Sequence, residues 1–291
     1  MTPFVFGAGY SGRFYARTVR ERTDTIFGTT RAFDKAAMLE AAGMKPLVLD
    51  ETGTGPFVGA LRETTHLVVS AAPGEGGDPL LEAFGRVVVG SMPKLEWVGY
   101  LSTVGVYGNH DGAWVTEEAE LRPSLQRTGR RVEAETQWLN FGVATGVPVA
   151  VLRLSGIYGP GRNALANLAA GTARRIVKQG QIFNRIEVRD IAGALVHLGE
   201  RRIGGIFNVS DDEPSPPQDV VAYAAMLMGM EPPPEIPFEE AELSPMARSF
   251  YGETKKVSNE RLKSTGYRFR FPDFRTALDQ LWASGDWKAE R

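Results

Sequence analysis

Three glycines near the start of the chain have the spacing of a phosphate-binding turn. They occur in the run Gly7-Ala8-Gly9-Tyr10-Ser11-Gly12, between the apolar run Pro3-Phe4-Val5-Phe6 and a helical pattern. In a G-x-G-x-x-G turn the first glycine permits a tight bend, the second lets the backbone approach a pyrophosphate, and the third lets the helix pack on the strand. The start of the helix adds free N–H groups and a partial positive charge. We therefore predict a dinucleotide site with contacts from Gly7, Gly9, Tyr10, Ser11 and Gly12; the alternative is a glycine-rich turn without a ligand.

The end of the next strand bears on which dinucleotide is bound. Chains that bind NAD usually carry Asp or Glu there for the ribose 2′-hydroxyl, but this strand runs Ile26-Phe27-Gly28-Thr29-Thr30-Arg31. Arg31 could pair with a 2′-phosphate, and Thr29 or Thr30 could add a hydroxyl bond. This favours NADP over NAD, against the alternative of a surface arginine. Asp50 closes the third strand, where it could bond the adenine amino group or cap the next segment.

Short apolar runs alternate with amphipathic stretches in the first half of the chain. The runs show little polar alternation, as in strands buried on both faces of a parallel sheet. Alternation of strand and helix is typical of βαβ units, so we predict an α/β fold with a doubly wound parallel (Rossmann) sheet. The predicted strands are Phe4–Phe6, Thr25–Thr30, Pro46–Leu49, Leu67–Ser70, Trp97–Leu101 and Val149–Leu152, and the helices are Gly12–Glu21, Lys35–Ala42, Leu80–Val89 and Arg130–Phe141.

Proline and glycine become dense in the second half, where the elements are shorter. We expect residues 1–160 to form the NAD(P)-binding domain and residues 161–291 to form mainly a small α/β substrate lobe, with some segments returning to the sheet. The predicted elements are helices over Asp190–Glu200 (with Asp190 as the cap), over Gln218–Met228 and after Pro272, and a strand over Ile206–Val209.

Composition excludes several classes of function. The chain has no cysteine and only three separated histidines, so thiol chemistry is excluded and no metal site is predicted. The formal net charge is −2, without the basic field that a nucleic-acid binder needs. No apolar run reaches the roughly 18 residues of a membrane span, and no signal peptide is expected. We expect a cytoplasmic protein that contacts neither nucleic acid nor membrane.

Further segments share a pattern with a known family. They are Ser70-Ala71-Ala72-Pro73, Leu101-Ser102-Thr103-Val104-Gly105-Val106-Tyr107-Gly108, Arg153-Leu154-Ser155-Gly156-Ile157-Tyr158-Gly159-Pro160-Gly161 and Arg185-Ile186-Glu187-Val188-Arg189-Asp190-Ile191-Ala192. Together with the glycine turn they resemble the extended or atypical short-chain dehydrogenase/reductases, the NAD-dependent epimerase/dehydratase family, over most of the chain. The resemblance implies a Rossmann domain with a C-terminal substrate lobe, and it adds Ser70, Ala71 and Ala72 to the cofactor contacts.

The resemblance also implies a Ser or Thr, a Tyr and a Lys beside the nicotinamide, where the tyrosine passes a proton to or from the substrate oxygen. Thr103 matches the hydroxyl position, although it could equally bond local backbone at a strand end. The Tyr and Lys positions hold Arg127 and Arg131, and the chain contains no Tyr-x-x-x-Lys. Val104 and Gly105 replace the acid pair of sugar dehydratases, so we do not expect dehydration of a nucleotide sugar by the usual route.

Arginine cannot replace the tyrosine as a general base, because its pKa above about 12 keeps it protonated. Arg131 could bond a ribose or a phosphate, and Arg127 a carboxylate, a phosphate or a developing oxyanion; both could equally be exposed residues at a helix start. Other polar groups are expected near the strand ends: Tyr107, in a turn that is more often structural, Tyr158, and His110 and Asp111, in a predicted loop.

Two functions fit these residues best, and a weaker third is a structural subunit with a vestigial cofactor site. The first is an NADP(H)-binding oxidoreductase or epimerase-like protein with an altered proton-transfer group, acting on a carbonyl or sugar-nucleotide-like small molecule. The second is a non-catalytic NADP(H)-binding redox sensor or regulatory protein, because the Tyr and Lys are missing. The sequence leaves open whether the chain is an enzyme and which substrate it takes. A homodimer is also possible, although Arg127, Arg130 and Arg131 place like charges near the start of the helix through which family members often pair.

Overall fold

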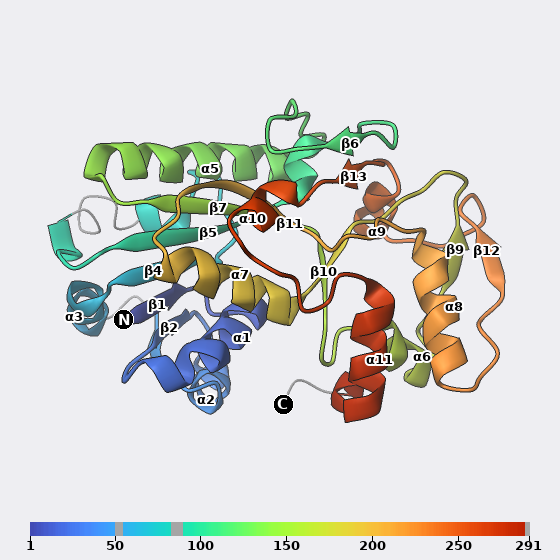
Figure 1. The fold of residues 1–291 in the computed structure, drawn as a ribbon, viewed down its shortest axis with the longest axis horizontal. Helices are drawn as coiled ribbons and strands as arrows, with labels where there is room; N and C mark the ends of the chain where they lie inside the picture. Colours follow the sequence, from blue (N-terminus) through green and yellow to red (C-terminus); the bar gives the residue numbers. More distant parts are fainter. Residues whose placement is uncertain (50–54, 83–89, 289–291) are drawn as a thin grey trace. The chain divides into compact units, whose positions relative to one another are not determined.

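A seven-stranded parallel sheet forms the centre of the fold (Figure 1). The structure, a computed structural model, describes residues 1–49, 55–82 and 90–288. The strand order is β11-β7-β5-β4-β1-β2-β3, which confirms the predicted doubly wound sheet. Every strand predicted for this sheet is present, and its ends differ from the prediction by at most two residues. The strands are β1 (Pro3–Phe6), β2 (Phe27–Thr30), β3 (Lys45–Val48), β4 (His66–Val69), β5 (Trp97–Thr103), β7 (Val149–Leu154) and β11 (Gly205–Val209).

Helices cover both faces of this sheet, because successive side chains of a strand point to opposite faces. Phe4 and Phe6 of β1 share one buried cluster with Phe57 and Trp138. Val5, between them, faces the helix that follows the glycine turn. The helices on the first face are α3 (Gly55–Glu63) and α5 (Gln126–Thr145); those on the other are α1 (Tyr10–Val19) and α7 (Val188–Glu200), while α2 (Ala36–Ala41) leads into β3 (Figure 1).

The chain divides into two units by its internal contacts. The first consists of Met1–Val106, Pro123–Arg153 and Ile191–Phe207, and the second of Tyr107–Arg122, Leu154–Asp190 and Asn208–Arg291. The predicted helix over Leu80–Val89 falls mostly on residues 83–89, outside the described residues. Within the described ranges, no helix has the length and the hydropathy needed to cross a bilayer.

The second unit is built from short elements. Leu168, Ala224, Phe274 and Leu278 form an apolar core between three of its helices. The strands pair in parallel as β8 (Gly156–Tyr158) with β10 (Arg185–Glu187), β9 (Arg175–Val177) with β12 (Glu235–Pro237), and β6 (Trp114–Val115) with β13 (Lys256–Val257); the helices are α6 (Ala164–Ala169), α8 (Pro217–Leu227), α9 (Pro245–Phe250), α10 (Glu260–Ser264) and α11 (Phe274–Ser284). The helices predicted over Gln218–Met228 and after Pro272 correspond to α8 and α11.

Candidate functional site

The glycine turn joins β1 to α1 and is held by the neighbouring strand. Gly7 has φ +75°, a left-handed conformation that glycine adopts at little cost. Its N–H donates to the Thr29 hydroxyl of β2 at 2.7 Å, and the Ala8 N–H donates to the Thr29 carbonyl at 2.9 Å. Thr29 is 1% exposed, so its hydroxyl faces the turn and not the solvent. The sequence suggested Thr29 only as a ligand for the ribose phosphate, and its role in holding the turn was missed.

The three glycines have different surroundings. A Cβ on Gly7 would lie 2.8 Å from the Ala71 nitrogen, and one on Gly12 would lie 2.8 Å from Cγ1 of Val5. A Cβ on Gly9 would meet nothing closer than the Gly7 carbonyl oxygen at 3.8 Å. Gly7 and Gly12 are therefore required by packing, whereas Gly9 leaves the backbone open to an approaching group. This is the arrangement that a bound pyrophosphate requires.

The first turn of α1 is suited to an anion. Gly9 is the N-cap residue without a side-chain cap, and the first turn contains no acidic residue. Tyr10 is half-buried and packs its ring on Phe14 at 5.1 Å between centroids, while Ser11 is buried. The positive end of the helix macrodipole is therefore not neutralised by a side chain of this turn.

Ser70, Ala71 and Ala72 directly follow β4, beside the glycine turn. The Ser70 N–H donates to the Phe6 carbonyl at 2.9 Å, and Ala71 lies against Gly7. The strand order reverses between β1 and β4, and ligands of open α/β sheets bind outside the carboxyl ends of the strands at such a point. The glycine turn and the Ser70–Ala72 segment thus meet where a dinucleotide is expected.

The end of β2 presents Arg31 to solvent. The half-buried Thr30 hydroxyl accepts from the Ala32 N–H at 3.2 Å and donates to the Ala32 carbonyl at 3.3 Å, which closes a turn around Arg31. Arg31 is exposed and has no hydrogen bond or ion pair with another residue in the described ranges. Asp50 lies outside the described residues, so its predicted contact with adenine stays a prediction.

Thr103 ends β5 beside the start of α5. Its hydroxyl accepts from the Gly105 N–H at 3.1 Å, which is the local backbone bond expected as the alternative to a catalytic role. A Cβ on Gly105 would lie 3.1 Å from Cγ2 of Thr128 and 3.4 Å from the Thr103 hydroxyl. The turn after Thr103 therefore packs on the first turn of α5, which carries Arg127. Thr103 and the helix turn that carries Arg127 thus belong to neighbouring segments, and their roles at the nicotinamide stay predictions.

Arg127 and Arg131 differ in their surroundings. Arg127 is exposed, whereas Arg131 is half-buried and donates to the Leu101 carbonyl at 2.7 Å and to the Tyr100 hydroxyl at 3.2 Å. Burial raises the pKa of Tyr100 to about 12, although the charge of Arg131 opposes the rise. Tyr100 is therefore neutral near pH 7, and Arg131 ties the start of α5 to β5.

One helical turn after Arg131, a buried ion pair joins α5 to β7. Arg153 donates from Nη2 to Oε2 of Glu135 at 2.7 Å, and the Ser102 hydroxyl also donates to Glu135. Both charged side chains are 3% exposed. The two residues are 18 positions apart, and nothing in their spacing identifies them as partners.

The other candidate polar groups belong to the second unit. The Tyr107 hydroxyl donates to Oδ1 of Asn208 at 2.7 Å within buried surroundings, which is a structural role. The Tyr158 hydroxyl is buried, and burial raises its pKa. Nε2 of His110 lies 3.2 Å from the Glu120 carbonyl, and Asp111 has φ +50°. In the described part of the chain, no three His, Asp or Glu side chains gather in a metal-binding group.

Asp190 does not cap α7, so that prediction was wrong. The helix begins at Val188, and the Asp190 carboxylate accepts instead from the backbone N–H groups of Arg270 and Phe271, each at 2.8 Å, and from the Tyr267 hydroxyl. Burial raises the pKa of Asp190, and these bonds oppose the rise. The carboxylate thus fixes a distant segment of the second unit.

Glu187 should make the free energy of unfolding depend on pH. Burial raises its pKa from 4.5 to about 7, although the Arg189 charge opposes the rise. The folded chain then holds a proton that the unfolded chain has lost, so this contribution is complete below about pH 4.5 and is lost as pH rises to about 7. We expect Glu187→Gln to flatten the change between pH 8 and pH 5 by about 2–3 kcal/mol in urea titrations. An unchanged dependence of the unfolding free energy on pH in Glu187→Gln would contradict the raised pKa of Glu187. Burial lowers the pKa of His66, which makes stability rise with pH, but this contribution is the same in the wild-type chain and the variant.

Comparison with known proteins places these features in a family. No protein-family model matches the chain. Protein YeeZ from Escherichia coli K12 is 26% identical over 280 residues, which cover 92% of this chain and 96% of YeeZ. A conserved protein of unknown function from Silicibacter pomeroyi is 44% identical, with a TM-score of 0.89 over 98% of this chain and 99% of that chain.

More distant solved structures share the fold. The human epimerase family protein SDR39U1, solved with NADPH, is 18% identical with a TM-score of 0.70 over 97% of this chain and 99% of its own. The UDP-glucuronic acid 4-epimerase from Bacillus cereus, solved with NAD, is 16% identical with a TM-score of 0.75 over 97% and 96% of the two chains. The chain therefore belongs to the same family as the Silicibacter pomeroyi protein, and it has the fold of the extended short-chain dehydrogenase/reductases and epimerases that its motifs resemble.

Proposed function

We propose that this chain binds NADP(H) and acts as an oxidoreductase or epimerase-like enzyme on a carbonyl or sugar-nucleotide-like substrate. The open backbone at Gly9, beside a helix start without an acidic residue, carries the proposal. Gly7, Gly9, Tyr10, Ser11 and Gly12 would hold the pyrophosphate. NADPH in the human relative and NAD in the Bacillus cereus relative support a dinucleotide in this fold.

The remaining site residues would position the reactants. Ser70, Ala71 and Ala72 would line the cofactor, which supplies or accepts a hydride when bound. The Thr103 hydroxyl accepts from the Gly105 N–H, so its own proton could be donated to a substrate oxygen. Arg127 could stabilise negative charge on that oxygen, and Arg131 would keep the Leu101 carbonyl in place.

Arg31→Ala tests the preference for NADP. The side chain is exposed at the end of β2, where a 2′-phosphate is expected, so its loss removes a charge-assisted bond worth about 1.5–3 kcal/mol. We expect NADPH to bind roughly ten- to a hundredfold more weakly and NADH to bind nearly as before, as measured by nicotinamide fluorescence. Equal losses for the two cofactors would contradict the 2′-phosphate role. Arg22→Ala, which removes a cation from an exposed ion pair with Glu200, is the matched control.

A non-catalytic NADP(H) sensor is the second candidate function. Its support is that Arg127 and Arg131 stand at the Tyr and Lys positions and that Arg131 is already bonded to β5. Transfer of deuteride from labelled NADPH to any member of a carbonyl and sugar-nucleotide panel would establish the enzyme. Tight NADPH binding with no transfer across the panel would favour the sensor.

A further inference from the structure

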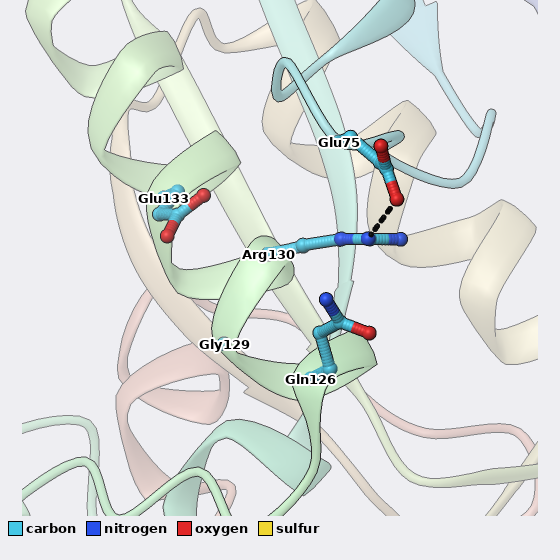
Figure 2. A pocket seen from close by; sticks show the side chains of 5 residues that line it. All are labelled: Glu75, Gln126, Gly129, Arg130 and Glu133. Carbon is cyan, nitrogen blue, oxygen red and sulfur yellow. Dashed lines mark hydrogen bonds and ion pairs between the residues drawn. The ribbon is translucent and has the colours of Figure 1, made fainter.

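A hollow of about 460 Å³ lies in the first unit, at the start of α5. It is lined by Glu75, Gln126, Gly129, Arg130 and Glu133 (Figure 2). Four of these residues come from the first two turns of the helix, and Glu75 comes from the loop after β4. Both walls continue from segments that we assign to the cofactor site, because the loop follows Ser70–Ala72 and the helix turn carries Arg127. A molecule in this hollow would therefore lie next to the proposed site.

An ion pair joins two of the residues that line the hollow. Nη2 of Arg130 lies 3.0 Å from Oε1 of Glu75, and the two side chains are 25% and 90% exposed. Glu75 is at the tip of a turn closed by the bond from the Gly74 N–H to the Gly77 carbonyl at 2.8 Å. Arg130 projects from a helix and is mostly buried, whereas the Glu75 side chain is almost fully exposed on its loop. A pair this exposed adds little stability, so it exchanges easily.

Three arginines lie close together near the start of α5. The first turn of α5 contains no acidic residue, and Arg127, Arg130 and Arg131 follow one another near the positive end of the helix dipole. Arg131 is stabilised by the Leu101 carbonyl and the Tyr100 hydroxyl. In the described ranges, Arg130 pairs with the exposed Glu75. A guanidinium whose partner is a solvent-exposed carboxylate can bind the anionic group of a ligand instead.

We propose that Arg130 binds a carboxylate group of the substrate and that Glu75 occupies this place until the substrate displaces it. The proposal rests on the function proposed above, because the hollow adjoins the cofactor segments. The group already paired with Arg130 is a carboxylate, and the planar guanidinium matches two carboxylate oxygens better than a point charge does. The Gln126 side chain lies on the same side of the helix as Arg130 and Glu75 and could donate to the same anion, while Glu133 also lines the hollow but forms no ion pair with Arg130 in the described ranges (Figure 2).

The test uses sodium acetate as the probe, with sodium chloride at equal ionic strength as the reference. In ¹⁵N-labelled full-length protein, acetate should shift the Nε–Hε signal of Arg130, which is assigned by its loss in Arg130→Gln. Glu75→Gln removes the internal competitor, and we expect acetate to bind about two- to fivefold more tightly. Glu63→Gln, which breaks another surface ion pair, with Lys94, should leave binding unchanged.

Two results would overturn the carboxylate site: acetate binding that is no tighter in Glu75→Gln, or inorganic phosphate that binds this variant more tightly than acetate does. NADPH titration of the same proteins separates this inference from the proposed function. Glu75→Gln and Arg130→Gln should keep wild-type NADPH affinity. A wild-type chain that binds acetate at Arg130 but not NADPH would refute the proposed function while leaving the anion site in place.

Discussion

Gly9→Ala should weaken NADPH binding at least about tenfold while the melting temperature stays unchanged. Gly9 has φ −81° and ψ −154°, an extended conformation that alanine also adopts, and its added methyl group meets no protein atom closer than 3.8 Å. The methyl would instead occupy the space through which a pyrophosphate approaches the backbone. Loss of one well-aligned bond to a charged oxygen is worth about 1.5–3 kcal/mol, or roughly ten- to a hundredfold in the dissociation constant. Fluorescence titration and differential scanning calorimetry measure the two quantities.

Gly12→Ala is the matched control within the same turn. Its Cβ would lie 2.8 Å from Cγ1 of Val5, so the extra methyl must push α1 away from β1 and should lower stability by about 1–3 kcal/mol. Gly9→Ala should therefore lower NADPH affinity without lowering the melting temperature, whereas Gly12→Ala should lower the melting temperature. If Gly9→Ala also lowers the melting temperature, Gly9 is required by packing; if it leaves NADPH affinity intact, the pyrophosphate does not bind at Gly9.

Arg153→Met should lower the free energy of unfolding by about 3–5 kcal/mol. The substitution keeps most of the apolar stem but leaves the carboxylate of Glu135, which is 3% exposed, without its cationic partner. The Ser102 hydroxyl alone cannot compensate an unpaired buried charge. Urea unfolding followed by tryptophan fluorescence measures the loss, because Trp138 lies in the same helix as Glu135.

Two further variants make this prediction specific. Combining Arg153→Met with Glu135→Leu removes both charges and should recover much of the lost stability, because well-packed apolar groups can replace a buried pair. Arg22→Ala breaks an exposed pair with Glu200 and should lower stability by at most about 1 kcal/mol. Similar losses for Arg153→Met and Arg22→Ala would show that the buried charge is not the cause.

The central sheet was predictable because most of its strands contain a short apolar run, as in Phe4–Phe6 of β1 and Leu67–Val69 of β4. The glycine turn was equally clear, since its spacing is local and its neighbours in sequence are its neighbours in space. The pairs of strands in the second unit were not predicted, because runs of two or three residues such as Trp114–Val115 leave no periodicity to detect.

The supporting contacts of the site were not predictable for a different reason. Glu135 and Arg153 are 18 positions apart, and Asp190 reaches the Phe271 N–H across 81 positions. Such pairs depend on which side chains meet after folding, and a single sequence does not record that. A carboxylate near a helix start usually caps that helix, which is why Asp190 was predicted to do so. Its carboxylate instead accepts from two backbone N–H groups of another segment.

The bond from Gly7 to Thr29 has a consequence for how cofactor choice can change. Strand β2 carries Thr29, which shapes the phosphate turn, and two residues later Arg31, which faces the solvent. A variant designed to bind NADH can therefore change Arg31 without disturbing the turn, but it must keep a hydroxyl at position 29 to accept from the Gly7 N–H. If Arg31 selects the cofactor as proposed, we expect relatives to vary at position 31 while position 29 stays a serine or threonine.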